Sequence, residues 1–86
     1  MSEVISKVTK NAREVLFLSL SEFKGRRLLD IRVYVPGDDK GEFVPTRKGI
    51  SLSVGLYPAF KKALAQVEDA MIKQGLIDAA DLEPGD

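Results

Sequence analysis

Two short basic segments hold the residues whose types and spacing could bind a ligand. They are Phe23-Lys24-Gly25-Arg26-Arg27 and Pro45-Thr46-Arg47-Lys48-Gly49, separated by roughly the length of one long strand and its return. Basic side chains on two neighbouring turns of one small sheet would attract a polyanion. In the alternative interpretation, Arg47 and Lys48 end a strand, Gly49 bends the chain, and the charges only keep a sheet edge soluble. The residue types leave both interpretations open.

The charge of the chain is unevenly distributed. The formal net charge is 0, with 13 basic and 13 acidic residues. Residues 1–48 hold ten basic and seven acidic residues, whereas residues 49–86 hold three basic and six acidic residues. The first part therefore carries a charge of +3 and the second a charge of −3. Because the approach of a ligand depends on the local field, this asymmetry favours an anionic partner for the first part.

Catalysis is the least favoured class of function. The chain has no cysteine and no histidine, which removes disulfides, thiolate metal sites and the commonest general base. No pair of acidic residues stands in an apolar context, and no glycine-rich loop leads into a helix. We therefore expect no catalytic residues, no metal and no cofactor, and the protein is not expected to be an enzyme.

Length and hydropathy predict one small intracellular domain. The chain has 86 residues, which suits a single domain with a small core. No apolar run approaches the about 18 residues of a membrane span, and the N-terminus lacks the pattern of a secretory signal. We expect a cytoplasmic protein with no membrane partner.

Alternating apolar and polar residues predict a four-stranded antiparallel sheet. The alternation is clear over residues 15–21 and 27–35, and the turn residues 36–41 should close a hairpin onto a strand at 42–47. Gly49 should open a short last strand, residues 50–53. Residues 1–14 show no firm period, and we expect them to form a flexible N-terminal arm. The expected class is α+β, a curved β-meander followed by a helix.

The helix is predicted from apolar residues that recur at spacings of three and four. These residues are Tyr57, Phe60, Leu64, Val67 and Met71. Ser53 could cap the helix, but Pro58 would then lie too deep in the first turn, so the alternative start is nearer Leu56 or Tyr57. Gly75 should end the helix. Residues 77–86 form an acidic tail that we expect to be mobile.

One helix cannot cover a whole face of a four-stranded sheet. A second copy related by a two-fold axis is the simplest cover, since two-fold dimers are the commonest soluble oligomers. We therefore expect a homodimer with the apolar helical stripe at its interface.

Single-stranded nucleic acid is the ligand class that fits the basic segments best, since it needs cations for phosphates and flat groups for exposed bases. Phe23 is the best stacking candidate, although it could equally fold back into the core. Arg32, in mid-strand beside Asp30 and Tyr34, could instead pair locally with carboxylates. The clustering of basic residues around two turns favours the binding interpretation.

The order and spacing of residues 22–26, 28–34 and 45–52 resemble the C-terminal domain of the transcriptional coactivator positive cofactor four. The likeness covers about residues 15 to 72. It implies a DNA-binding domain over residues 15–76 in a homodimer whose subunits each contribute a curved sheet and a C-terminal helix. Family members bind single-stranded or melted DNA in transcription, replication or repair. The resemblance therefore implies transcription or replication proteins as partners and a nucleoid-associated location.

Carried over by position, the resemblance implies a set of DNA-contacting residues in which cations hold phosphates and two other side chains meet bases or sugars. The set is Phe23, Lys24, Arg26, Arg32, Pro45, Arg47, Lys48 and Gly49. Val35 stands where the eukaryotic pattern has an aromatic residue, and Val44 stands where it has a lysine. Without the long serine- and lysine-rich N-terminal region of eukaryotic members, the chain is similar to a minimal bacterial or phage-type member.

The expected function is single-stranded DNA binding that is largely independent of sequence. Two alternatives stay open. The first is a protein-interaction module that recruits polymerase or replication factors, and the second is an RNA-binding protein.

Overall fold

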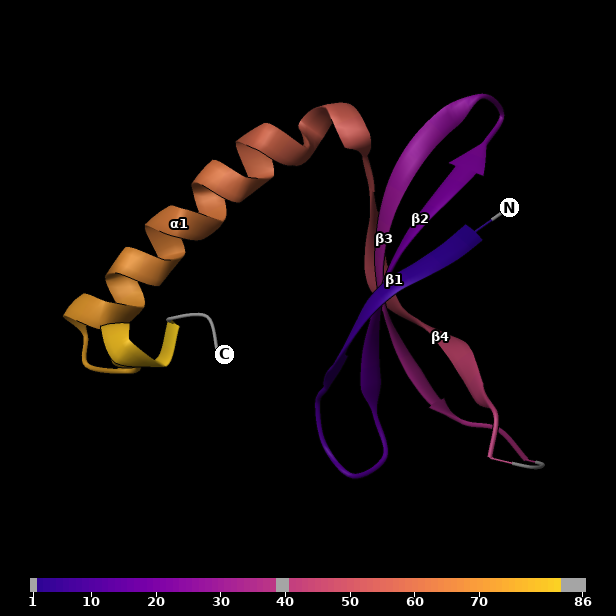
Figure 1. The fold of residues 1–86 in the computed structure, drawn as a ribbon, viewed down its shortest axis with the longest axis horizontal. Coiled ribbons are helices and arrows are strands. Elements are labelled where there is room, and N and C mark those ends of the chain that lie inside the picture. Colours follow the sequence, from indigo (N-terminus) through magenta and orange to yellow (C-terminus); the bar gives the residue numbers. More distant parts are fainter. Residues whose placement is uncertain (1, 39–40, 83–86) are drawn as a thin grey trace. The chain divides into compact units, whose positions relative to one another are not determined.

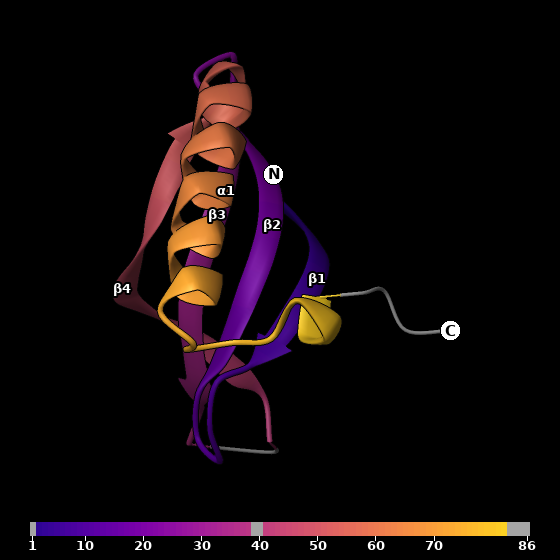
Figure 2. The ribbon, with the colours of Figure 1, turned by 90° about the vertical axis from the view of Figure 1, so that its left-hand side faces the viewer.

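A computed structural model describes residues 2–38 and 41–82. The chain divides into two compact units, residues 1–55 and 56–86. The first unit is a four-stranded antiparallel sheet in the order β1–β2–β3–β4, with consecutive strands side by side (Figure 1). The strands are β1 (Ser2–Thr9), β2 (Val15–Phe23), β3 (Arg26–Pro36) and β4 (Phe43–Ser53). The expected curved meander followed by one long helix is confirmed, and the curvature of the strands is visible in Figure 2.

The two central strands have the faces that their alternation predicts. In the β2–β3 register, Phe17 lies opposite Arg32 and Ser19 opposite Asp30, whereas Leu16 lies opposite Val33. Since side chains alternate along a strand, Phe17, Ser19, Asp30, Arg32 and Tyr34 share one side of the sheet, which we call the polar face. The other side, which we call the apolar face, carries Leu16, Leu18, Leu20, Leu29, Ile31 and Val33.

The first strand was not predicted. Residues 1–14 were expected to form a flexible arm, but Ser2–Thr9 forms β1 and pairs with β2. The register shifts between Val4 and Ser6, so that Val4 lies opposite Ser19 while Val8 lies opposite Leu16. This bulge moves the side chains after Ile5 to the other face, and for that reason no single period appears in the sequence.

The last strand is one strand where two were expected. The expected strands, 42–47 and 50–53, are replaced by the single β4 over residues 43–53, and Gly49 lies within it. On β3, two steps separate Arg32 from Tyr34, but their partners Gly49 and Pro45 are four steps apart. Residues 46–48 therefore bulge out opposite Val33 alone, and we call them the β4 bulge. Proline and glycine mark this bulge and not a strand end.

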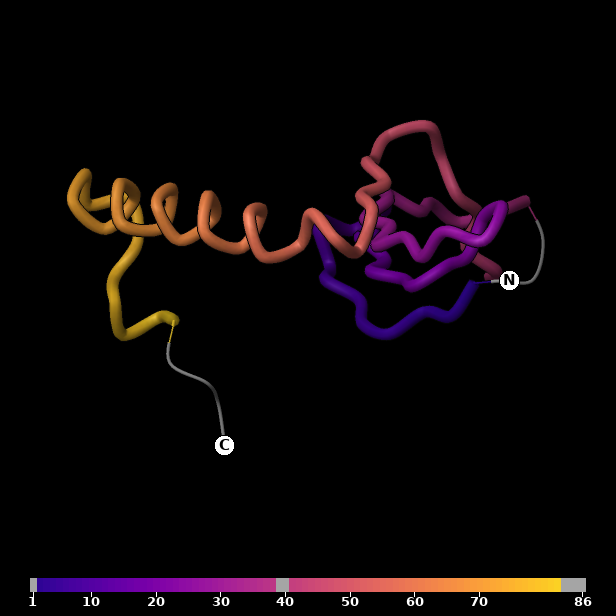
Figure 3. The backbone as a smooth tube through the Cα atoms, turned by 90° about the horizontal axis from the view of Figure 1, so that it is seen from above, coloured from indigo at the N-terminus to yellow at the C-terminus, as the bar shows by residue number. Residues whose placement is uncertain are grey.

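The second unit contains the helix α1 (Tyr57–Lys73), after which the chain reverses direction (Figure 3). Pro58 lies in the first turn, where its missing N–H costs no hydrogen bond, and no side chain caps the helix. Ser53 is therefore not the cap. Gly75, at φ 73°, ends the helix as predicted, because its N–H bonds to Ile72 O and the N–H of Leu76 to Met71 O.

The chain then forms two short helical segments outside α1. The helical turn η1 (Val54–Leu56) precedes α1, and η2 (Ala79–Leu82) follows it. The last four residues of the expected acidic tail lie outside the described residues. Within residues 2–38 and 41–82, no helix is both long and apolar enough to cross a bilayer.

Few side chains of the described residues are buried. Val33 and Ser19 are the residues with little exposure, at 6% and 5%. In the apolar stripe of α1, Leu64 and Val67 are 55% and 52% exposed. Tyr57 is exposed as well, whereas Phe60 and Met71 are half-buried. The stripe thus presents a large apolar surface in the single chain.

Candidate nucleic-acid interface

The β2–β3 hairpin presents Phe23 and its basic neighbours to solvent. Phe23 lies opposite Arg26, so only Lys24 and Gly25 form the turn, with φ of 51° and 79°. Two consecutive positive φ values give a tight hairpin whose twist matches the strands, and glycine takes that conformation at no steric cost. Phe23 is 61% exposed, and Lys24 Nζ lies 5.3 Å from its ring centroid. The interpretation of Phe23 as a core residue is therefore wrong.

Arg32 lies on the polar face and is held by its neighbours. Its Nε and Nη2 donate to the two carboxylate oxygens of Asp30 at 3.2 and 3.0 Å, and its Nη1 donates to Thr46 O at 3.1 Å. The local pairing with a carboxylate considered from the sequence is thus present. Three of the five guanidinium N–H groups are engaged in these bonds, and two remain for another acceptor.

Asp30 is a carboxylate between two donors. Ser51 donates a hydrogen bond to Asp30 from β4. Partial burial acts to raise the pKa of Asp30, but the hydrogen bonds from Arg32 and Ser51, with the charge of Arg32, outweigh it and hold the pKa below its usual value. The hydrogen bond and charge of Asp30 in turn raise the pKa of Arg32. Both groups are charged at neutral pH, which fixes the guanidinium plane on the sheet.

The β4 bulge is held by the hydroxyl of Thr46. Thr46 Oγ1 donates to Val33 O at 2.8 Å and accepts from Lys48 N at 3.2 Å. These bonds use backbone groups that the interrupted ladder leaves without strand partners. The bulge exposes both Arg47 and Lys48. The second basic segment is therefore a fixed bulge and not a turn.

Gly49 and Pro45 flank the bulge, each opposite a residue of the polar face. Gly49 lies opposite Arg32, and a Cβ there would come within 2.5 Å of Ile31 O and 2.8 Å of Arg32 Cα. Glycine is therefore required for the close approach of β4 to β3. Pro45 lies opposite Tyr34 and is exposed.

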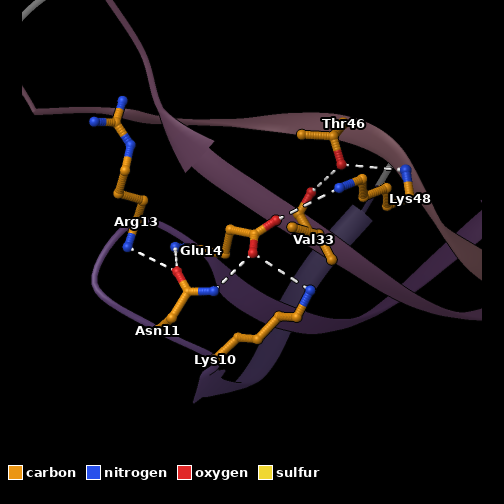
Figure 4. Close-up of polar contacts among 7 residues, drawn as sticks. All are labelled: Lys10, Asn11, Arg13, Glu14, Val33, Thr46 and Lys48. Atoms are coloured by element: carbon orange, nitrogen blue, oxygen red, sulfur yellow. Dashed lines mark hydrogen bonds and ion pairs between the residues drawn. The ribbon is translucent and has the colours of Figure 1, made fainter.

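Lys48 reaches the turn between β1 and β2 (Figure 4). Its Nζ lies 3.9 Å from Glu14 Oε2, while Glu14 Oε1 accepts from Asn11 Nδ2 at 2.8 Å and pairs with Lys10 Nζ at 3.3 Å. The hydrogen bond from Asn11, followed by that from Lys10, lowers the pKa of Glu14. This carboxylate therefore competes with any anionic ligand for Lys48, a role that no sequence pattern indicated.

The predicted residues form a stripe and not one cluster. The hairpin residues Phe23, Lys24 and Arg26 lie at one end of β2 and β3. Arg32 is six residues further along β3, about 20 Å away at 3.3 Å per residue. Gly49, Pro45 and the bulge adjoin Arg32. Val35 lies opposite Val44, and both alternate away from the polar face.

The polar face also carries aromatic residues that the sequence did not single out as a site. The rings of Phe17, Tyr34 and Phe43, from three strands, lie together, with Lys7 over the Phe17 ring. Alternation places Phe17 and Tyr34 on one face of their strands. Their contact, however, depends on the β2–β3 register, and that of Phe43 depends on the bulge in β4.

Comparison with known proteins supports a family assignment. The family described as Transcriptional Coactivator p15 (PC4) matches residues 10–63, more than half of the chain. The RNA polymerase II transcriptional coactivator KELP of Arabidopsis thaliana is 41% identical over 56 residues, which cover 65% of this chain and 33% of KELP. The matched region thus spans about a third of that relative's length.

Solved structures share the fold. A PC4 homologue from Burkholderia pseudomallei has 34% sequence identity and a TM-score of 0.70, covering 79% of this chain and 98% of the homologue. MoSub1, solved in a complex with DNA, has 28% sequence identity and a TM-score of 0.61. The match covers 81% of this chain and 85% of the MoSub1 chain. The resemblance drawn from residues 22–52 is confirmed, and the chain belongs to the PC4 family of transcriptional coactivators.

Proposed function

We propose that this protein binds single-stranded DNA along the polar face, largely without regard to sequence, and acts in transcription or in replication and repair. The observation that supports this most is the stripe from the hairpin to the β4 bulge. An exposed ring at Phe23 and the exposed cations Lys24, Arg47 and Lys48 border one face of one sheet. Single-stranded DNA needs both kinds of group, for its bases and its phosphates.

Each predicted residue has a distinct role in this proposal. Lys24, Arg26, Arg47 and Lys48 hold phosphates, and Arg32 adds its two remaining N–H donors. Phe23 stacks on a base, and Pro45 contacts a base or sugar. Gly49 touches no DNA through a side chain, but it allows β4 to approach Arg32. MoSub1, which shares the fold, was solved with DNA, and this supports assigning the same ligand class to this chain.

The proposal includes a homodimer formed through α1. Leu64, Val67 and Tyr57 expose apolar surface along one stripe of the helix, and Phe60 and Met71 extend it. A contiguous apolar stripe on a small protein favours an interface, and a two-fold axis lets one patch cover itself. A dimer would also bring two polar faces to one DNA molecule, which increases affinity through effective concentration.

The test is a titration of a labelled single-stranded oligonucleotide, followed by fluorescence anisotropy, at several salt concentrations. Phosphate contacts predict a log–log salt slope of about −0.7 for each phosphate neutralised. A dissociation constant no tighter than about 10⁻⁴ M at low salt would contradict the proposal, since non-specific electrostatic binding alone reaches about 10⁻⁴ to 10⁻⁶ M even at physiological salt.

A further inference from the structure

Three aromatic rings meet on the polar face at a distance from Phe23. The Phe17 and Tyr34 rings are stacked, with centroids 3.9 Å apart and planes 5° from parallel. The Phe43 ring centroid lies 6.3 Å from that of Phe17, with the planes tilted by 35°. Lys7 of β1 places its Nζ 4.9 Å from the Phe17 centroid. We call Phe17, Tyr34 and Phe43 the aromatic cluster.

The aromatic cluster lies on the same face as the proposed DNA stripe. Phe17 is directly opposite Arg32, and Tyr34 is opposite Pro45. Phe17 is six residues from Phe23 along β2, about 20 Å at 3.3 Å per residue. The cluster thus extends the stripe from Phe23 past Arg32, away from the hairpin.

Sheet stability accounts for only part of this arrangement. A stacked pair on neighbouring strands stabilises their register, which suffices to explain Phe17 and Tyr34. It does not explain Phe43, which is 41% exposed on β4, two strands from Phe17. The ammonium group of Lys7 lies over the Phe17 ring because β1 pairs Lys7 with Phe17, and this exposed side chain places a cation beside the cluster. Exposed rings beside a cation are what an unpaired nucleotide needs for its base and its phosphate.

We propose that the aromatic cluster is a second base-stacking site, occupied by a nucleobase of the same single strand that contacts Phe23, with Lys7 holding the adjacent phosphate. This inference rests on the proposed function. Phe43 supplies the accessible ring, and the Phe17–Tyr34 stack holds it on the polar face. Strand β1, which places Lys7 opposite Phe17, then becomes part of the binding surface.

The test compares two ligands of equal charge: an oligothymidine and an abasic oligonucleotide of the same length. Phe43→Ala is compared with Val44→Ala, the neighbouring residue of similar exposure, 41% against 43%, which alternates to the other face. We expect Phe43→Ala to weaken oligothymidine binding about 5- to 150-fold, the range for one stacked base, and to leave abasic binding unchanged. Val44→Ala should change neither.

A second pair of variants guards against loss of folding. Phe17→Tyr keeps an aromatic ring and should bind oligothymidine within about twofold of the parent, whereas Phe17→Leu should lose affinity for oligothymidine alone. Circular dichroism and thermal melting report whether each variant keeps the sheet. Equal losses on both ligands, or no loss from Phe43→Ala on either, would overturn the stacking site.

The same titrations separate this inference from the proposed function. If the parent protein binds oligothymidine and its affinity depends on salt, the proposed function stands whatever the Phe43 variant does. If the parent protein binds neither ligand, the function and the second site are both overturned.

Discussion

The guanidinium of Arg32 and the carboxylate of Asp30 form a two-point ion pair on the polar face, with Nε–Oδ2 at 3.2 Å and Nη2–Oδ1 at 3.0 Å. The pair fixes Arg32 against the sheet, and the third bond, to Thr46 O, ties it to the β4 bulge. Arg32 therefore helps to position Arg47 and Lys48, in addition to the DNA contact that the family resemblance implies for it.

Stability should decrease in acid through Asp30. Its pKa is lowered in the folded chain, so the ionised form contributes stability above its ordinary pKa of 3.8, and this contribution is lost as the pH falls through the lower folded value. We expect the free energy of unfolding to decrease more steeply below about pH 4 in the parent protein than in Asp30→Asn. Urea unfolding at a series of pH values measures this. Identical pH profiles for the two proteins would contradict it.

Removing the two bulge cations should weaken DNA binding and flatten its salt dependence. Arg47→Ala with Lys48→Ala removes two phosphate contacts, which should reduce the magnitude of the log–log salt slope by about 1.4. Anisotropy titrations at several salt concentrations give the slope. The control is Lys61→Ala with Lys62→Ala, which removes the same charge from α1 and should leave the slope close to that of the parent. An unchanged slope in the bulge variant would show that its residues do not contact phosphate.

Replacing Glu14 should strengthen DNA binding. Its carboxylate lies 3.9 Å from Lys48 Nζ and 3.3 Å from Lys10 Nζ, so it competes with phosphate for both. We expect Glu14→Gln to lower the dissociation constant at low salt by only a few-fold, since exposed charge pairs are weak and are screened by salt. Glu68→Gln removes the same charge from α1, outside the proposed set of DNA-contacting residues, and should have less effect. Weaker binding by Glu14→Gln would contradict this role.

Gly49 should tolerate no side chain. A Cβ would lie 2.5 Å from Ile31 O, which is backbone and cannot move aside cheaply. Gly49→Ala should therefore lower the free energy of unfolding by about 1–3 kcal/mol. Gly55→Ala is the matched control, because its Cβ would meet nothing closer than Ser53 Oγ at 3.7 Å. Denaturant unfolding of both variants measures this difference. Equal stability of Gly49→Ala and Gly55→Ala would contradict the close approach of β4 to β3.

An acidic residue in the helical stripe should abolish the proposed dimer. Leu64→Asp would place a carboxylate in an apolar interface, where it cannot be solvated. Light scattering at micromolar concentration should give the mass of two chains for the parent and of one chain for the variant. Gln66→Asp, on the polar side of α1, introduces the same charge and should remain dimeric. A parent protein with the mass of one chain would contradict the dimer.

The sequence predicted those elements whose period is unbroken. Residues of β2 and β3 alternate without interruption, and their faces followed directly. The Gly75 end of α1 was predicted because glycine at positive φ is the commonest helix stop. The two outer strands were not predicted correctly because each contains a bulge. The register shift at Ile5 interrupts the alternation in β1, and the β4 bulge interrupts it in β4, so that one strand was predicted as two.

The candidate site divides in the same way. A basic side chain is recognised from its residue type alone, so Lys24, Arg47 and Lys48 could be predicted as candidate phosphate contacts from the sequence. The partnership of Glu14 with Lys48, and of Phe43 with Phe17, joins residues that are not on adjacent strands. Such contacts depend on register and twist, which residue type and spacing do not specify.

Preference for unpaired DNA tests the central claim most directly. One labelled strand, its duplex and the RNA of the same sequence, each of about 20 to 30 bases, are titrated with the protein at one salt concentration. We expect the single strand to bind at least about fivefold tighter than the duplex, because only unpaired bases can stack on Phe23. Tighter binding of RNA than of DNA would identify RNA as the ligand of the site. Equal or tighter binding of the duplex would contradict the account.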